Sequence, residues 1–361
     1  MTKRAALVLS GGKARRFQTQ NQSWQDKALA ELDGKPLLVH TIENVEGIVD
    51  EIIVCVNDEE RKAKYAKTLI EHDLDAKIVI DEKIDHVSGP NVAILSGLKA
   101  AKADYCLTLP CDMPFLKSEV ADFLFAKSDG FEVVVPMWPN GRLETLIMVL
   151  QRQTSLEVTD TLCRLRRPRS DDIPRGASKT LLVSPMQQIK SLDPELRSFI
   201  NINSLEDLKR LRTRRIHGPV KDDVELDFGM LSISDLWLLR NGAKMMREDK
   251  FLEAEKTFDF CIKNFEVCSF FFWAGVAGEN KGEALLAQSQ LQPNPEASVE
   301  LDSEGKEAFL EAANNYRLEA KIYERNLCLL LEERALADKA WCESWAMGKT
   351  WHVHRYPPKR A

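Results

Sequence analysis

The sequence of 361 residues predicts an α/β domain built on a mostly parallel sheet, followed by an all-helical region. Up to about residue 212, short apolar runs alternate with amphipathic helical patterns, which is typical of strands joined by helices on both faces of a sheet. From residue 234 onward, apolar residues recur at helical spacing over long stretches. These two patterns predict the fold class.

The strands are predicted from short apolar runs, several of which are continuous, as expected of strands covered on both faces. In order they lie at residues 4–10, 51–57, 76–81, 104–111, 131–138, 145–150 and 180–185. The helical patterns between them occupy residues 35–45, 58–72, 91–103 and 117–128. Ligands of such sheets bind at the carboxyl ends of the strands. The residues that follow the strands, among them Gly11, Asn57 and Asp112, are therefore candidates for a site.

A Gly-Pro pair and mixed charge interrupt the pattern after residue 212. We therefore expect a first domain at residues 1–212, a linker at 213–233 and a helical domain at 234–361. The helical spacing in the last range fits tetratricopeptide-like hairpins and a plain bundle equally well. Within it, the segment "QLQPNPEASVELDSEG", residues 290–305, predicts a flexible loop.

The composition favours a soluble globular protein, with 44% hydrophobic and 29% charged residues. A net charge of −6 argues against a general nucleic-acid binder. No apolar run approaches the roughly 20 residues that a membrane-spanning helix needs. Eight cysteines lie mostly in apolar runs and form no CxxC pair, which indicates a reducing compartment. We therefore expect a cytoplasmic location.

The first strand ends in "LSGGKARRF", where two glycines precede several bases. Glycines let the backbone turn sharply and approach a ligand closely, and the main-chain amides of such a turn can form an anion site. Lys13, Arg15, Arg16 and Lys27 would then neutralise phosphate charge. The alternative is a strand followed by a loop and a solvated run of charges.

Two further segments carry oxygen ligands. In "TLPCDMPFL", Asp112 directly follows a buried strand, and prolines stiffen its exit. In "FININSLEDL", Asn201 and Asn203 alternate with isoleucines and are expected to share one face of a strand. Asp112 with an amide oxygen would suit Mg²⁺. The alternatives are a carboxylate that caps the next turn and an ordinary strand-to-helix turn.

A basic stretch, "RLRRPRSDDIPRG", covers residues 164–176. It could attract an anionic substrate. The favoured interpretation is a solvated helix end and loop.

Taken together, the segments "LSGGKARRF…DKALAELDGKPLL", "GPNVAILSGLKAA", "LPCDMPFL", "GRLETLIMVL" and "FININSLEDL" resemble the molybdenum cofactor guanylyltransferases. The resemblance covers residues 4 to about 212. It implies a Rossmann-like sheet of the nucleotide-diphospho-sugar transferase type. It also implies Mg²⁺-dependent transfer of GMP from GTP to the phosphate of molybdopterin that carries Mo or W.

The resemblance implies roles for individual residues. Lys27, Asp112 and Arg16 would be catalytic, and Asp112 with Asn203 would hold the metal. The segment "GRLETL", residues 141–146, would line the acceptor side. The nucleotide would contact the following residues: Leu9, Ser10, Gly11, Gly12, Lys27, Asn57, Asp81 and Asp112.

Two alternatives stay open. Other enzymes of this fold transfer CMP to molybdopterin or an isoprenoid phosphate, or GMP to cobinamide phosphate or phospholactate. The chain could instead be a non-enzymatic nucleotide-binding adaptor, whose helical domain binds a molybdoenzyme or a cofactor-insertion chaperone. No nucleic-acid or membrane partner is expected.

Overall fold

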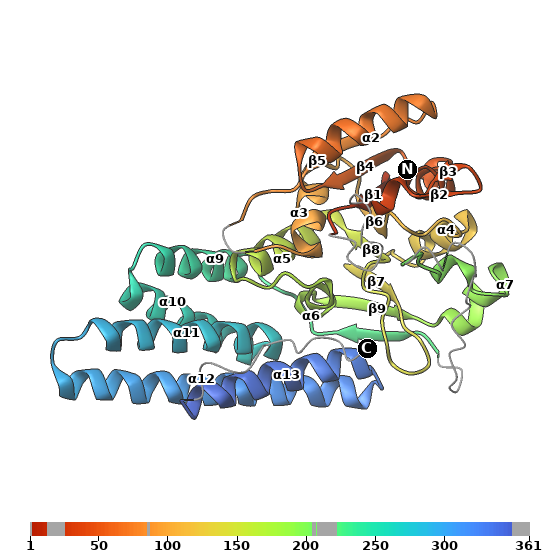
Figure 1. Cartoon of the computed structure of the whole chain (residues 1–361). Helices are drawn as coiled ribbons and strands as arrows, with labels where there is room; N and C mark the ends of the chain where they lie inside the picture. The colour runs from red at the N-terminus through yellow and green to blue at the C-terminus, as the bar shows by residue number, and fades with distance from the viewer. Residues whose placement is uncertain (1, 13–25, 85–86, 204–206, 208–221, 349–361) are drawn as a thin grey trace. The chain divides into compact units, whose positions relative to one another are not determined.

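A computed structural model describes residues 2–12, 26–84, 87–203, 207 and 222–348 (Figure 1). The chain divides into two compact units, Met1–Leu226 and Asp227–Ala361. The first unit contains the α/β sheet and the second is helical. Among the described residues, no helix is both long enough and apolar enough to cross a bilayer.

The first unit is built on an eight-stranded sheet with the order β10-β9-β7-β8-β6-β1-β4-β5. β1 pairs in parallel with β4 and β6, β4 with β5, and β7 with β9, while β8 runs antiparallel to β6 and β7. This confirms the mostly parallel sheet. The strands are β1 Arg4–Leu9, β4 Glu51–Val56, β5 Lys77–Ile80, β6 Tyr105–Pro110, β7 Val133–Pro136, β8 Met148–Gln151, β9 Lys179–Val183 and β10 Val224–Asp227.

Each of the strands predicted from the sequence is present, and β10 is an addition. β10 lies in the range 213–233 that the sequence analysis assigned to a linker, so part of that range belongs to the sheet. A short polar strand at a sheet edge has no apolar run to reveal it, since only Leu226 is buried. A separate hairpin pairs β2 (Glu31–Leu32) with β3 (Lys35–Pro36).

Helices cover both faces of the sheet because successive strand residues point to opposite faces. Ala6 and Val8 of β1 belong to a core cluster that also contains Leu38 of α1. Leu7 instead meets α3, where a Cβ added at Gly97 would lie 3.0 Å from its Cδ1. The helices of this unit are α1 Leu37–Glu46, α2 Glu59–Glu71, α3 Pro90–Ala100, α4 Ser118–Ala126, α5 Arg152–Arg164, α6 Ile173–Gly176 and α7 Lys190–Leu192.

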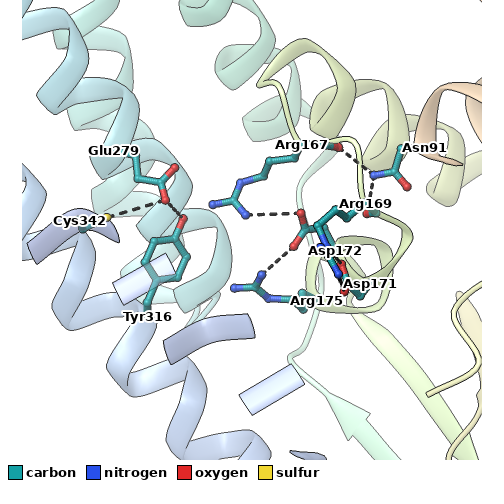
Figure 2. A network of polar contacts seen from close by, with 9 residues as sticks. All are labelled: Asn91, Arg167, Arg169, Asp171, Asp172, Arg175, Glu279, Tyr316 and Cys342. Carbon is teal, nitrogen blue, oxygen red and sulfur yellow. Dashed lines mark hydrogen bonds and ion pairs between the residues drawn. The ribbon is translucent and has the colours of Figure 1, made fainter. Parts of the chain in front are cut away.

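The second unit is a row of helices joined by three-residue turns, so each helix runs antiparallel to the next (Figure 1). Three of the turns contain a residue with positive φ: Asp249, Ser269 and Leu327. The helices are α9 Ile233–Arg247, α10 Phe251–Val267, α11 Phe271–Leu291, α12 Pro295–Arg325 and α13 Leu329–Ala346. Tyr316 of α12 donates a hydrogen bond of 2.6 Å to Glu279 of α11 (Figure 2).

The prediction of a flexible loop at residues 290–305 was wrong, because most of this range is helical. α12 begins at Pro295, and the Asn294 side chain caps it by accepting from the amide of Glu296. Proline at the first helical position and asparagine before it favour a helix start. The Pro-Asn-Pro signal therefore ends one helix and begins the next.

Candidate active site

The glycine turn after β1 packs against the ends of the neighbouring strands. The amide of Ser10 donates to the carbonyl of Cys55 on β4, and Leu9 accepts from the amide of Cys111 after β6. A Cβ added at Gly11 would lie 3.1 Å from Oδ2 of Asp81. The glycine turn thus lies beside Asp81, the residue that follows β5, at the carboxyl ends of the strands. The turn comprises Leu9, Ser10, Gly11 and Gly12.

Asp81 is a largely buried carboxyl at this edge. Burial raises its pKa from the ordinary 3.8 to about 7, although the nearby positive charge of Arg61 counteracts the shift. Its amide donates to the carbonyl of Val56 at 2.7 Å. Its Oδ1 is buried and has no hydrogen-bond partner among the described residues. A ligand with a polar hydrogen at this position would satisfy that atom.

Lys27 begins a short 3₁₀ turn, Lys27–Leu29, which is capped by the Asp26 side chain. Its Nζ contacts Oδ2 of Asp112 and lies 3.1 Å from Oδ1 of Asn203. Lys27 is separated by 85 residues from Asp112 and by 176 from Asn203. The structure therefore brings three sequence segments together around one ammonium group.

Asp112 is held where β6 leaves the sheet. The residue is only 7% exposed, and its carbonyl accepts from the amide of Ile202 at 3.1 Å. This backbone link places Asn203, the next residue, beside Lys27. Asn203 in turn donates its amide to Oδ2 of Asp207 at 2.9 Å. Residues 201–203 belong to no strand, contrary to the alternating pattern, yet Asn201 and Asn203 do line the same cavity.

That cavity has a volume of about 190 Å³. Trp138 lies in its wall and donates from Nε1 to Glu144 at 2.6 Å, and its ring meets the Phe199 ring edge-on at 5.1 Å. Oδ1 of Asn201 is buried and accepts no hydrogen bond from any described residue. The "GRLETL" segment, expected to line the acceptor side, contributes no residue to the cavity lining, and Glu144 contacts it only through Trp138. The lining residues are Trp138, Glu195, Leu196, Phe199, Ile200, Asn201, Asn203 and Asp207.

Arg61 and Tyr65 of α2 were missed by sequence reasoning. Arg61 donates to the carbonyls of Ser10 (2.9 Å) and Gly12 (3.0 Å) and to Oδ1 of Asn57 (3.1 Å). Tyr65 Oη lies 2.7 Å from Ser10 Oγ. Arg61, Tyr65 and Leu69 share the buried face of α2, so an arginine within an apolar stripe was the available signal.

Asn57 follows β4 as expected, and its amide oxygen is held by Arg61. Its Cβ lies 3.9 Å from the position of a Cβ on Gly11. Arg16, with Lys13 and Arg15, falls outside the described residues. The structure therefore brings together the glycine turn, Asn57 and Asp81 as one group, and Lys27, Asp112 and Asn203 as another.

The basic stretch 164–176 is not the solvated loop that was favoured. Arg167 and Arg175 are buried and flank the buried carboxylate of Asp172, at 3.5 Å and 2.7 Å respectively (Figure 2). The amide of Asn91 on α3 donates to the carbonyls of Arg167 and Arg169. Ion pairing offsets part of the cost of burying these cations, and no sequence pattern revealed the pairing.

The chemistry available at this edge follows from these groups. The Lys27 ammonium and the glycine turn at residues 9–12 suit an anion, while Asp112 and Asn203 offer oxygen ligands to a hard cation. Among the described residues, no cluster of three or more His, Cys, Asp and Glu side chains is arranged to hold a metal by itself. A cation here would need further oxygens from a substrate.

Comparison with known proteins identifies relatives of the first unit. The family model of the MobA-like NTP transferase domain matches residues 6–171. The probable molybdenum cofactor guanylyltransferase of Methanosarcina acetivorans is 35% identical over 225 residues, which cover 62% of this chain and 94% of that protein. The corresponding protein of Methanosarcina mazei is 31% identical over 209 residues, covering 58% of this chain and 89% of its own.

Among solved structures, molybdopterin-guanine dinucleotide biosynthesis protein A of Archaeoglobus fulgidus matches with 22% identity and a TM-score of 0.46. The match covers 57% of this chain and 95% of that chain.

Proposed function

The chain belongs to the MobA-like NTP transferase family, and from this premise we propose that it transfers GMP from GTP to the phosphate of molybdopterin. The products would be a pterin guanine dinucleotide and pyrophosphate. The observation that carries the proposal is the convergence of Lys27, Asp112 and Asn203 at the carboxyl edge of the sheet. The relatives at 35% and 31% identity are named as molybdenum cofactor guanylyltransferases, which supports the choice of substrates.

The nucleotide would lie along the edge formed by the glycine turn and the ends of β4 and β5. Residues 9–12 would wrap the phosphates, with backbone amides as donors. Asn57 and Asp81 would lie near the base and ribose, and the buried, unpartnered Oδ1 of Asp81 would accept a hydrogen from them. The Lys27 ammonium would donate to triphosphate oxygens and offset charge on the leaving group.

The residues present fit a magnesium ion. Oδ2 of Asp112 and Oδ1 of Asn203 both contact Nζ of Lys27, so the two oxygens converge on one region. Mg²⁺ in nucleotide sites commonly takes one or two protein oxygens and completes its shell with phosphates and water. Asp112 and Asn203 would hold the ion, which would supply charge neutralisation at the phosphate oxygens.

The acceptor would occupy the cavity beside Asn203. Its phosphate oxygen would attack the α-phosphorus of GTP, forming a new P–O bond as the bond to the β-phosphate breaks and pyrophosphate leaves. A phosphate monoester has a second pKa of about 6 and is already largely ionised at neutral pH. The protein therefore needs no general base. Its residues orient the two substrates and stabilise the charge that moves to the leaving group.

The test is incubation of the full chain with molybdopterin, Mg²⁺ and GTP labelled in the α-phosphate, followed by detection of a labelled pterin dinucleotide. Asp112→Ala is expected to abolish transfer nearly completely. Lys27→Ala is expected to lower kcat by about 10²-fold, as loss of one transition-state contact commonly does. Asp122→Asn is the matched control, since that exposed carboxylate pairs with Arg4 on the surface.

Two results would contradict the proposal. One is wild-type turnover by Asp112→Ala. The other is a pterin dinucleotide that forms with labelled CTP and not with GTP, which would assign the chain to CMP transfer.

A further inference from the structure

Two residues of α2 connect the two groups of site residues. We propose that Arg61, assisted by Tyr65, is a positioning residue that holds the glycine turn and Lys27 in one common geometry for nucleotidyl transfer. The inference rests on the proposed function for the identity of the substrates. Neither residue is expected to touch the substrate, because their hydrogen-bonding atoms are directed to protein groups.

The first step concerns the turn. The Arg61 guanidinium binds the carbonyls of Ser10 and Gly12 from one side, at 2.9 and 3.0 Å. In a trans peptide unit the N–H points opposite to the C=O, and the described chain has no cis peptide bond. The amide hydrogen of Gly11, which shares a peptide unit with the Ser10 carbonyl, therefore points away from Arg61. Arg61 thus fixes the orientation of the turn, with the carbonyls of Ser10 and Gly12 directed toward α2 and the amide of Gly11 directed away from it.

The second step concerns Lys27. Nε of Arg61 lies 3.1 Å from Oδ2 of Asp26, and both side chains are only 7% exposed. Tyr65 donates to Oδ1 of the same carboxylate at 3.0 Å. Asp26 also caps the 3₁₀ turn by accepting from the amide of Ala28 at 3.1 Å. The backbone that carries Lys27 is therefore attached to α2 through a buried carboxylate that forms an ion pair with Arg61 and accepts a hydrogen bond from Tyr65.

The third step concerns the helix itself. Arg61 and Tyr65 are four residues apart and so lie on one face of α2. Asp58 caps α2 by accepting from the amide of Arg61 at 2.8 Å, and it is the second residue after β4, which ends at Val56. The start and phase of α2 are thus set by the sheet. Because α2 is rigid, its position fixes the placement of both the glycine turn and Lys27.

A buried ion pair with a structural role alone would give the same contacts, so the test needs a readout that separates the two roles. A structural pair predicts lower thermal stability with unchanged kinetic constants in whatever protein remains folded. A positioning role predicts a loss of kcat at saturating nucleotide in variants that still melt cooperatively. It also predicts that the loss depends on Lys27, the group being positioned.

The central variant is Arg61→Lys in the full chain. Lysine keeps the charge, but a single ammonium cannot reproduce the fork that reaches the turn and Asp26 together. Displacement of catalytic groups by about 1 Å can cost on the order of 10²-fold. For a displacement of this size we expect kcat to fall at least tenfold. The affinity for GTP, measured by calorimetry without acceptor, should fall as well. Lys67→Gln, an exposed lysine on the same helix, should match wild type.

Two milder variants protect the test against misfolding. Tyr65→Phe removes a hydroxyl, and Asp26→Asn removes a charge while keeping the capping oxygen. Each should lower kcat by less than Arg61→Lys does. In a Lys27→Ala background, Arg61→Lys should lose the part of its effect on kcat that acts through Lys27, while the fall in GTP affinity that acts through the glycine turn should remain.

Two outcomes overturn the inference. One is wild-type kcat and GTP affinity in folded Arg61→Lys and Tyr65→Phe, with a change in melting temperature only. The other is an Arg61→Lys effect that lowers kcat by the same factor in wild type and in Lys27→Ala, which would show that Arg61 does not act through Lys27. Failure of the proposed substrates would appear in the wild-type protein, and the variant comparison would then be made with the nucleotide that wild type does transfer. The two failures are therefore distinguishable.

Discussion

The residue that best shows how the environment changes chemistry is Asp81. Its carboxyl lies against the glycine turn, where a Cβ on Gly11 would come within 3.1 Å of Oδ2. Burial there disfavours the charged form and raises the pKa to about 7, with Arg61 opposing the shift. The sequence placed Asp81 after a strand, but its ionisation depends on the groups that pack around it.

Asp81→Asn should stabilise the protein in a pH-dependent way. Between the ordinary pKa of 3.8 and the folded-state value of about 7, the folded protein binds more protons than the unfolded chain. The free energy of unfolding therefore falls as pH rises through this window. Asparagine has no charge to bury, so the variant should melt at a higher temperature than wild type at pH 8. The difference should shrink at pH 5, and a difference that is the same at both values would contradict the raised pKa.

At the scale of elements, the helical unit depends on close packing between α11 and α12. Glycines on α11 allow this approach: a Cβ added at Gly275 would lie 2.7 Å from the Tyr316 ring. One at Gly278 would lie 2.9 Å from the Cβ of Ala312. In the sequence these glycines weaken the helical signal, because glycine costs about 1 kcal/mol relative to alanine in a helix. The packing explains why they are tolerated.

Gly278→Ala should therefore destabilise the helical unit, although alanine is a better helix former than glycine. Alanine gains about 1 kcal/mol of helix propensity, but overpacking a tight contact costs roughly 1–3 kcal/mol. Denaturant unfolding should show a lower free energy of unfolding. Gly305→Ala on α12 is the matched control, since its added Cβ would meet the flexible end of Leu286 at 3.1 Å. Equal stabilisation by both substitutions would show that the approach of α11 and α12 is looser than described.

At the scale of the whole molecule, the candidate site lies within one unit. The glycine turn, Lys27, Asp112 and Asn203 all belong to Met1–Leu226. The Methanosarcina acetivorans relative is covered over 94% of its length by only 62% of this chain. The helical unit Asp227–Ala361 therefore has little counterpart there, and the molybdoenzyme or chaperone partner expected for it stays a prediction.

A shortened chain of residues 1–230, which retains β10, is expected to fold and to bind GTP with the same dissociation constant as the full chain. The physical reason is that the sheet, its covering helices and the described site residues all lie in that range. Calorimetry on both proteins makes the comparison. A folded fragment that no longer binds nucleotide would show that the helical unit contributes to the site.

The sequence by itself determined the alternation of strands and helices and the residues that follow each strand. These features are local, because an apolar run or a helical period is visible in neighbouring residues. It therefore predicted Gly11, Asn57 and Asp112 at the carboxyl ends of strands, and the structure places them there. Ser10 and Asp81 were implied by the family resemblance.

Only the tertiary structure decided which of these groups meet. Lys27 and Asn203 are 176 residues apart and converge because the amide of Ile202 binds the carbonyl of Asp112. Arg61 lies in the predicted helix at residues 58–72, where the sequence analysis gave it no role, and the structure buries it against the turn. Such pairings depend on strand order and on the desolvation of single side chains, and a buried charge is tolerated only where distant residues supply its partners. Distant partners leave no periodic trace in the chain, so sequence patterns did not reveal them.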